Sequence, residues 1–218
     1  MSVKKASKVK REYNNQGIHT KVSITLSIIA IGIMGYLGIR HYAGLGFEGD
    51  WGRYALAQSL MGLMGLIGTM AIRSDFNFRF RDFNINTGFF AMITLVGAMV
   101  TQVLSQYVLT ITNTEQALYY VFSSVCEELF FRLFLINLLL MFDQEKKLTT
   151  KLIAVLIAAV GFAAFHQNYY GNIGLLVGVF LGGCVFGIAY ILTDDITVPI
   201  LAHFILNIIA TGNWLVTL

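Results

Sequence analysis

Three ionisable residues, Glu127, Glu128 and Arg132, lie inside a stretch of the chain that is otherwise apolar. The flanking segments 118–125 and 133–142 are almost wholly hydrophobic, which is typical of a membrane-spanning helix. A charge in the middle of a bilayer costs roughly 2.5 to 3.5 kcal/mol on insertion scales, so a carboxylate pair at this depth is a candidate functional site. Carboxylates of this kind can serve as general bases toward water.

Helical spacing places the carboxylates of Glu127 and Glu128 on different faces of the helix. Glu128 and Arg132 are four residues apart, so they lie on one face and form an ion pair with the acid on the N-terminal side. Glu127 points about 100° away around the helix and has no partner in its own span. A buried network that only fixes helix packing would explain the ion pair well but Glu127 poorly. Glu127 is therefore the candidate general base.

Histidines and an amide add polar groups to other apolar runs. Phe162 lies one helical turn before His166 on the same face, and Asn207 lies one turn after His203. One membrane histidine alone is often just hydrogen-bonded to a neighbouring helix. Two histidines, an amide and an unpaired glutamate in three spans are better explained by a shared site. The other two histidines are expected to be solvated at the surface: His19 and His41.

Composition identifies the protein class. The 218 residues are 56% hydrophobic and only 12% charged, about half the charge of a soluble domain. With a mean hydropathy of +0.70, the chain is expected to be an all-α, polytopic transmembrane bundle of about seven spans, within a range of six to eight. The apolar runs are 22–39, 54–72, 87–111, 117–142, 152–166, 173–192 and 198–218.

Two of these runs carry repeated glycines, spaced regularly in the sixth run and less regularly in the second, which predict close helix packing. In the second run they are Gly62, Gly65 and Gly68, and in the sixth they are Gly174, Gly178 and Gly182, continued by Gly183 and Gly187.

Basic residues predict the orientation. They concentrate in the tail 1–21 and in the segments after the second and fourth runs, whereas the alternate loops hold only Arg40 and Arg53. The positive-inside rule then places the N-terminus in the cytoplasm. The net charge of +3 accordingly reflects topology and attraction to lipid headgroups, and nucleic-acid binding is not expected.

Depth along the helices predicts which way the site opens. At 1.5 Å per residue, Glu127 and His166 lie about 20 Å from the cytoplasmic ends of their runs and can meet at one level. By the same rise, His203 and Asn207 lie about 10 to 15 Å from Thr197. The site is therefore expected to open toward the cytoplasm.

Three ordered motifs resemble those of the CAAX protease and bacteriocin-processing family of membrane proteases, also called ABI, which includes the type II CAAX prenyl proteases. The motifs are Glu127-Glu128-x-x-x-Arg132, Phe162-x-x-x-His166 and His203-x-x-x-Asn207. The resemblance covers about residues 121–210. We expect a basic cytoplasmic tail at 1–21, transmembrane helices without family motif at 22–115 and a catalytic helical core at 116–218.

This resemblance implies a glutamate-dependent endopeptidase without metal or cofactor. Glu127, assisted by His166, would take a proton from water, while His203 and Asn207 would donate hydrogen bonds to the developing oxyanion. A second set of residues would support these groups: Glu128, Arg132 and Phe162. The leading substrate is a prenylated CAAX protein that loses its C-terminal tripeptide. A bacteriocin or signalling-peptide precursor and a membrane-protein tail are also compatible.

Rival mechanisms use the same region. Glu127, His166 and His203 are an acceptable ligand set for a catalytic zinc ion that would activate the water. Cys126 with His166 has the residue types of a nucleophile pair, although a cysteine in an apolar span is more often inert packing. Two neighbouring hydroxyls are equally weak candidates for a nucleophile: Ser123 and Ser124.

A non-enzymatic class also stays open. A membrane immunity or interaction protein, or a small transporter, could reuse the polar cluster for binding, since family membership alone does not establish turnover. For the protease the expected partners are membrane lipids and a peptide or lipidated protein substrate, whereas the non-enzymatic class would bind an ion or a peptide.

Overall fold

The computed structural model describes residues 50–72, 85–105, 114–143, 147–166 and 169–216, together with Thr25, Ile29 and Gly32. The regular elements of these residues are all helices, which confirms the expected all-α class. They are α2 (Asp50–Ile72), α3 (Ile85–Leu104), α4 (Thr114–Glu128), the π-helix η1 (Leu129–Ile136), α5 (Asn137–Leu140), α6 (Leu148–Phe165), α7 (Ile173–Thr193) and α8 (Thr197–Val216). The tail 1–21, His19, Arg40 and His41 lie outside the described residues.

Four of the described helices are long and apolar enough to cross a membrane, namely α2, α3, α6 and α7. The protein is therefore an integral membrane protein, while the total of seven spans stays a prediction. The fifth apolar run was predicted to begin at Leu152, but α6 begins at Leu148. Two threonines and a lysine separate these positions, and they continue the helix although they interrupt the apolar run.

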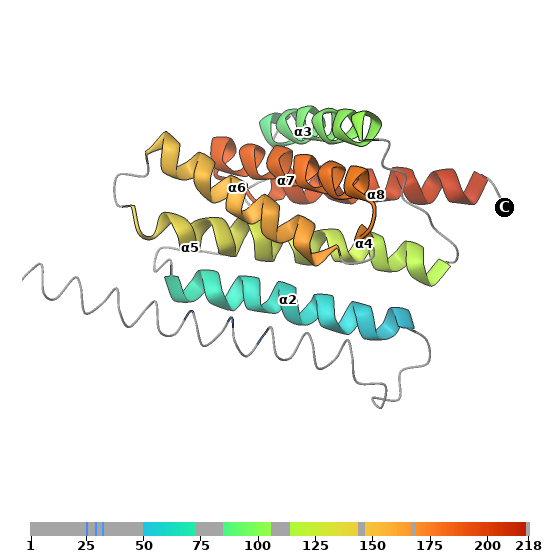
Figure 1. Ribbon diagram of the computed structural model, residues 1–218, viewed down its shortest axis with the longest axis horizontal. Helices are drawn as coiled ribbons and strands as arrows, with labels where there is room; N and C mark the ends of the chain where they lie inside the picture. The colour runs from blue at the N-terminus through green and yellow to red at the C-terminus, as the bar shows by residue number, and fades with distance from the viewer. Residues whose placement is uncertain are drawn as a thin grey trace, which may run out of the picture.

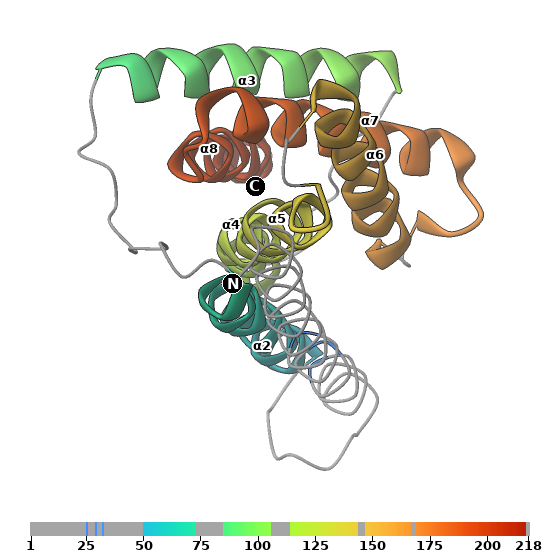
Figure 2. The ribbon, with the colours of Figure 1, turned by 90° about the vertical axis from the view of Figure 1, so that its left-hand side faces the viewer.

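A continuous rod of α4, η1 and α5 occupies the centre of the molecule (Figure 1). The rod packs against α2 on one side and against α6 and α8 on the other. Figure 2 shows α2, α4 and α8 nearly end-on, whereas α3 runs across the page and is strongly inclined to them. The inclined α3 packs on both α7 and α8.

Phenylalanines of η1 form the core where these helices meet. Phe130, Phe131 and Phe134 are buried together with Met61 of α2 and Phe162 of α6. On the opposite face of η1, a second cluster of aliphatic residues packs against α6 and the end of α7. Apolar side chains thus surround the middle of the rod, where Glu128 and Arg132 are almost completely buried.

Close approach of α2 to the rod confirms the packing predicted from its glycines. A Cβ atom on Gly65 would overlap the backbone carbonyl of Leu129, and one on Gly68 would overlap the ring of Phe134. In α7 the tight positions are Gly183 and Gly187, whereas a Cβ on Gly182 would make only an ordinary contact at 3.7 Å. The close contacts of α7 are therefore made by Gly183 and Gly187 and not by the four-residue repeat that ends at Gly182.

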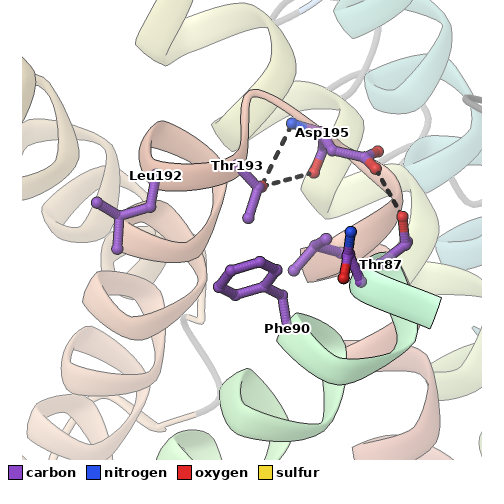
Figure 3. Close-up of a pocket in the computed structure, with 7 residues that line it drawn as sticks. Thr87, Phe90, Leu192, Thr193 and Asp195 are labelled. Atoms are coloured by element: carbon purple, nitrogen blue, oxygen red, sulfur yellow. Dashed lines mark hydrogen bonds between the residues drawn. The ribbon is translucent and has the colours of Figure 1, made fainter. Parts of the chain in front are cut away.

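The turn between α7 and α8 fixes the start of α8. Asp194 has a φ of +49°, and the next carboxylate, of Asp195, accepts a hydrogen bond from the backbone N–H of Thr197 at 2.9 Å. Thr87 at the start of α3 donates to the same carboxylate at 3.3 Å. Figure 3 shows Thr87 and Asp195 at a cavity of about 230 Å³, which is lined by none of the predicted site residues. This junction sets the position of the helix that carries His203 and Asn207.

The substitution Gly65→Ala is expected to destabilise the protein by about 1 to 3 kcal/mol, because the methyl group meets backbone that cannot yield. Gly161→Ala is the matched control, since its Cβ would contact Phe131 at an ordinary 3.5 Å. The control should be neutral or stabilising by up to about 1 kcal/mol through helix propensity. Thermal unfolding in detergent measures both, and equal midpoints for the two variants would contradict the close packing of α2 on η1.

Candidate active site

Glu128 is the most enclosed carboxylate of the site, with none of its side chain exposed. Its Oε1 lies 2.8 Å from Nδ1 of His203, and its Oε2 forms an ion pair with Nε of Arg132 at 3.2 Å. The second contact lacks hydrogen-bond alignment and acts through charge. The predicted pairing of Glu128 with Arg132 is therefore confirmed, and His203 is a further partner from α8.

Arg132 is buried among aromatic rings. Its guanidinium carbon lies 4.3 Å from the centre of the Phe162 ring and 5.4 Å from that of Phe186. Nη2 donates to the carbonyl oxygen of Gly183 at 3.3 Å, while Nη1 has no hydrogen-bond partner in the described part of the chain. The cation is thus stabilised by one carboxylate, one carbonyl and the faces of two rings.

Glu127 faces the opposite side of His203. Its Oε2 lies 4.0 Å from Nε2 of His203, and its Oε1 accepts a hydrogen bond of 3.1 Å from the amide of Gln58 in α2. Both of these partners come from other helices. His203 therefore stands between two carboxylates, one on each ring nitrogen.

A π-helix begins directly after these carboxylates. The eight residues of η1 have the wider turn of i→i+5 hydrogen bonding and include Arg132. Such segments are rare and occur frequently at functional sites. The change from α to π geometry lies between Glu128 and Arg132, so it sets how these two side chains are offset around the rod.

Each imidazole of the site is oriented by a group that accepts a hydrogen bond from it. Nδ1 of His166 lies 2.8 Å from the carbonyl oxygen of Phe162, so Nδ1 carries the hydrogen and Nε2 is left as an acceptor. Nδ1 of His203 likewise donates to Glu128. The ring of Phe162 lies between the two imidazoles, 4.7 Å from His166 and 6.0 Å from His203.

A cavity of about 50 Å³ joins three of the four predicted catalytic residues. His166, His203 and Asn207 line it, together with Thr101 and Gln102 of α3. Since one water needs roughly 10 to 15 Å³ of cavity volume, this cavity has room for a few waters. Glu127 does not line this cavity, and no hydrogen bond or ion pair joins it to His166 within the described ranges.

Asn207 is tied to the neighbouring rod. Its Nδ2 donates to the backbone carbonyl of Tyr120 in α4 at 2.7 Å. The bond crosses from α8 to α4 one turn beyond His203, so the amide is held at the wall of the cavity.

The rival residues are placed less favourably. Among the residues that the structure covers, no three His, Cys, Asp or Glu side chains gather as a metal site would require. Cys126 is buried, and a Cβ on Gly62 would lie 3.0 Å from its sulfur. The hydroxyls of Ser123 and Ser124 donate to backbone carbonyls of their own helix.

Gln58 is a site residue that the sequence interpretation missed. A signal was present, because Gln58 lies four residues before Gly62 and seven before Gly65. These spacings place it on the face of α2 that the glycines press against the rod. A polar side chain on a predicted packing face must meet a partner there.

Comparison with known protein families identified one match over part of the chain. Residues 112–209 match the family model described as type II CAAX prenyl endopeptidase Rce1-like. This segment contains all three sequence motifs and confirms the family resemblance. No curated protein and no solved structure matched the chain.

A double-mutant cycle on Glu128 and Arg132 tests the buried pair. Arg132→Met leaves a buried carboxylate without its cation and should cost about 3 to 5 kcal/mol. Adding Glu128→Gln should restore part of that loss, with a coupling energy of about 0.5 to 3 kcal/mol. Unfolding midpoints of the wild type, both single variants and the double variant give the coupling. Strict additivity would show that the ion pair does not stabilise the fold.

Proposed function

We propose, on the premise that residues 112–209 belong to the Rce1-like family of membrane proteases, that this protein is an intramembrane glutamic endopeptidase. One observation carries the proposal. His203 is oriented by Glu128 on one nitrogen and faces Glu127 with the other, at the wall of a water-sized cavity. The proposed base thus lies beside the proposed oxyanion donor, and that donor lines the cavity.

Water activation is the first step of the proposed reaction. Glu127 takes a proton from a water molecule, and the acceptor Nε2 of His166 holds and orients that water from the cavity side. The resulting hydroxide adds to the carbonyl carbon of the scissile peptide bond. No hydrogen bond or ion pair joins Glu127 to His166 within the described residues, and the water and the substrate would occupy the space between them.

Oxyanion stabilisation is the second requirement. The carbonyl oxygen becomes negative as hydroxide adds, and Nε2 of His203 with the amide of Asn207 donate to it. Donation from Nε2 requires a hydrogen on that nitrogen as well as on Nδ1, and the carboxylates of Glu127 and Glu128 lie 4.0 and 2.8 Å from the two ring nitrogens. The proton on Glu127 then passes to the leaving amine as the C–N bond breaks.

Supporting residues hold the proposed catalytic groups in position. Glu128 fixes His203, Arg132 neutralises Glu128, and the Phe162 ring packs between the guanidinium and both imidazoles. Glu128 and Arg132 act on the reaction through His203, and Phe162 lines the cavity beside it. They make the position of His203 independent of the bound peptide.

The proposed substrate follows from the family. A prenylated CAAX protein that loses its C-terminal tripeptide is the first candidate, with the prenyl group in the lipid beside the bundle. We further propose seven spans, a cytoplasmic N-terminus and a site that opens toward the cytoplasm. The apolar outer faces of α3 and α6 contact lipid in this arrangement.

Replacing the base tests the mechanism. Purified Glu127→Gln should fail to cleave a fluorogenic farnesylated CAAX peptide, because an amide cannot accept the proton. Glu115→Gln, at an exposed carboxylate of the same helix, should keep wild-type activity. Wild-type turnover should survive exhaustive metal chelation. Turnover that is lost on chelation and restored by zinc would assign Glu127, His166 and His203 to a metal instead, and an inactive wild type would favour the non-enzymatic class for this substrate.

Truncating the second oxyanion donor tests the geometry. Asn207→Ala should lower kcat by about 10²- to 10³-fold and change KM little, since the lost hydrogen bond forms only in the transition state. Because Asn207 also bonds Tyr120, the unfolding midpoint is measured in parallel. A raised KM with unchanged kcat would remove Asn207 from the oxyanion site and make it a substrate-binding residue.

A further inference from the structure

Gln58 is a buried polar side chain on α2, outside the segment that matches the protease family. Only 6% of it is exposed. Its amide nitrogen lies 3.1 Å from Oε1 of Glu127 and 3.2 Å from the hydroxyl of Tyr119. Both amide hydrogens are therefore directed at α4, and one of them is directed at the proposed base.

The carboxylate dictates which way this amide faces. An ionised carboxylate only accepts hydrogen bonds, so the nitrogen and not the oxygen of Gln58 must point toward Glu127. In this orientation Oε1 of Gln58 is buried and has no hydrogen-bond partner among the described residues. Native proteins leave few buried polar atoms unsatisfied, and such atoms often mark a functional constraint.

Helix packing holds Gln58 at this distance. The glycines of α2 allow its backbone to reach the rod one and two turns further along, at Cys126 and Leu129. A larger residue at Gly62 or Gly65 would separate the helices and withdraw Gln58 from the carboxylate. The contact thus depends on a backbone approach that the sequence of α2 specifically permits.

We propose that Gln58 is a positioning residue that holds Oε1 of Glu127 and leaves Oε2 as the oxygen that takes the proton from water. Oε2 is the oxygen that faces His203, at 4.0 Å. A carboxylate held at one oxygen cannot rotate freely, so its second oxygen keeps a fixed direction. The functional unit then includes α2 as well as the matched segment. This inference rests on the proposed function for the role of Glu127 as base.

A purely structural role is the alternative to positioning. Gln58 also bonds Tyr119, and the rings of Tyr54 and Tyr119 lie 6.1 Å apart, so α2 and α4 have other polar and aromatic links. If Gln58 only joins the helices, its loss should lower stability without changing the chemistry of Glu127. The test therefore needs a readout at the carboxyl group itself.

Gln58→Met is the decisive variant, because methionine keeps the length of the side chain and removes the donor. Thr69→Val is the matched control, since Thr69 is also buried on α2 and, among the residues that the structure describes, its hydroxyl bonds only the carbonyl of Gly65. Each purified protein is treated with dicyclohexylcarbodiimide. A carboxylic acid adds across this reagent and rearranges to a stable N-acylurea with no leaving group, which mass spectrometry locates on Glu127.

Removal of the donor should speed modification of Glu127 by about ten-fold, as expected for a lost hydrogen bond to a charged group. With the farnesylated peptide, kcat should fall by about 10- to 100-fold while KM changes little. The control should match the wild type in both assays. Gln58→Leu, which also lacks the amide donor, serves as a second variant if Gln58→Met does not fold, and it should also lower kcat.

The two assays separate failure of the inference from failure of the proposed function. Faster modification together with an inactive wild type would support the positioning of Glu127 and refute the peptidase on this substrate. Equal modification rates in the wild type and the variant would overturn the role of Gln58 whatever the turnover. A lower unfolding midpoint with unchanged modification and kcat would assign Gln58 to helix packing alone.

Discussion

The buried carboxylate of Glu128 is the interaction on which the rest of the site depends. A charge without solvent must be compensated, and Glu128 is compensated by Arg132 on one oxygen and by His203 on the other. These partners come from the rod and from α8. The contact of His203 with this charge therefore fixes α8 against the centre of the molecule, and Asn207 is positioned by the same helix.

Aromatic packing makes that arrangement rigid. The Phe162 ring contacts the guanidinium of Arg132 and lies between both imidazoles, and the Phe186 ring stacks on His203 at 4.8 Å. Rings offer large flat surfaces with few rotamers, so they fix neighbouring planar groups at a low entropic cost. The motif phenylalanine thus has a physical reason to lie one turn before His166.

The sequence predicted what depends on spacing within one helix. The pairing of Glu128 with Arg132, the isolation of Glu127 in its own span and the packing face of α2 all follow from helical periodicity. Contacts between helices were not accessible in this way. Spacing cannot tell which neighbour a face meets, so the bonds of Glu128 to His203 and of Glu127 to Gln58 were missed. The π-helix was also missed, because apolar residues carry no local sign of i→i+5 bonding.

Helix α3 lines part of the cavity but carries none of the groups proposed to break the bond. This helix lies outside the matched segment, yet it supplies Ala98, Thr101 and Gln102 to the cavity that the two histidines share. The groups proposed to break the bond belong to α4, α6 and α8, whereas one wall of the space in which a substrate would lie belongs to a different part of the chain. Substitutions in α3 would therefore change the shape of the cavity and leave the groups proposed to break the bond in place.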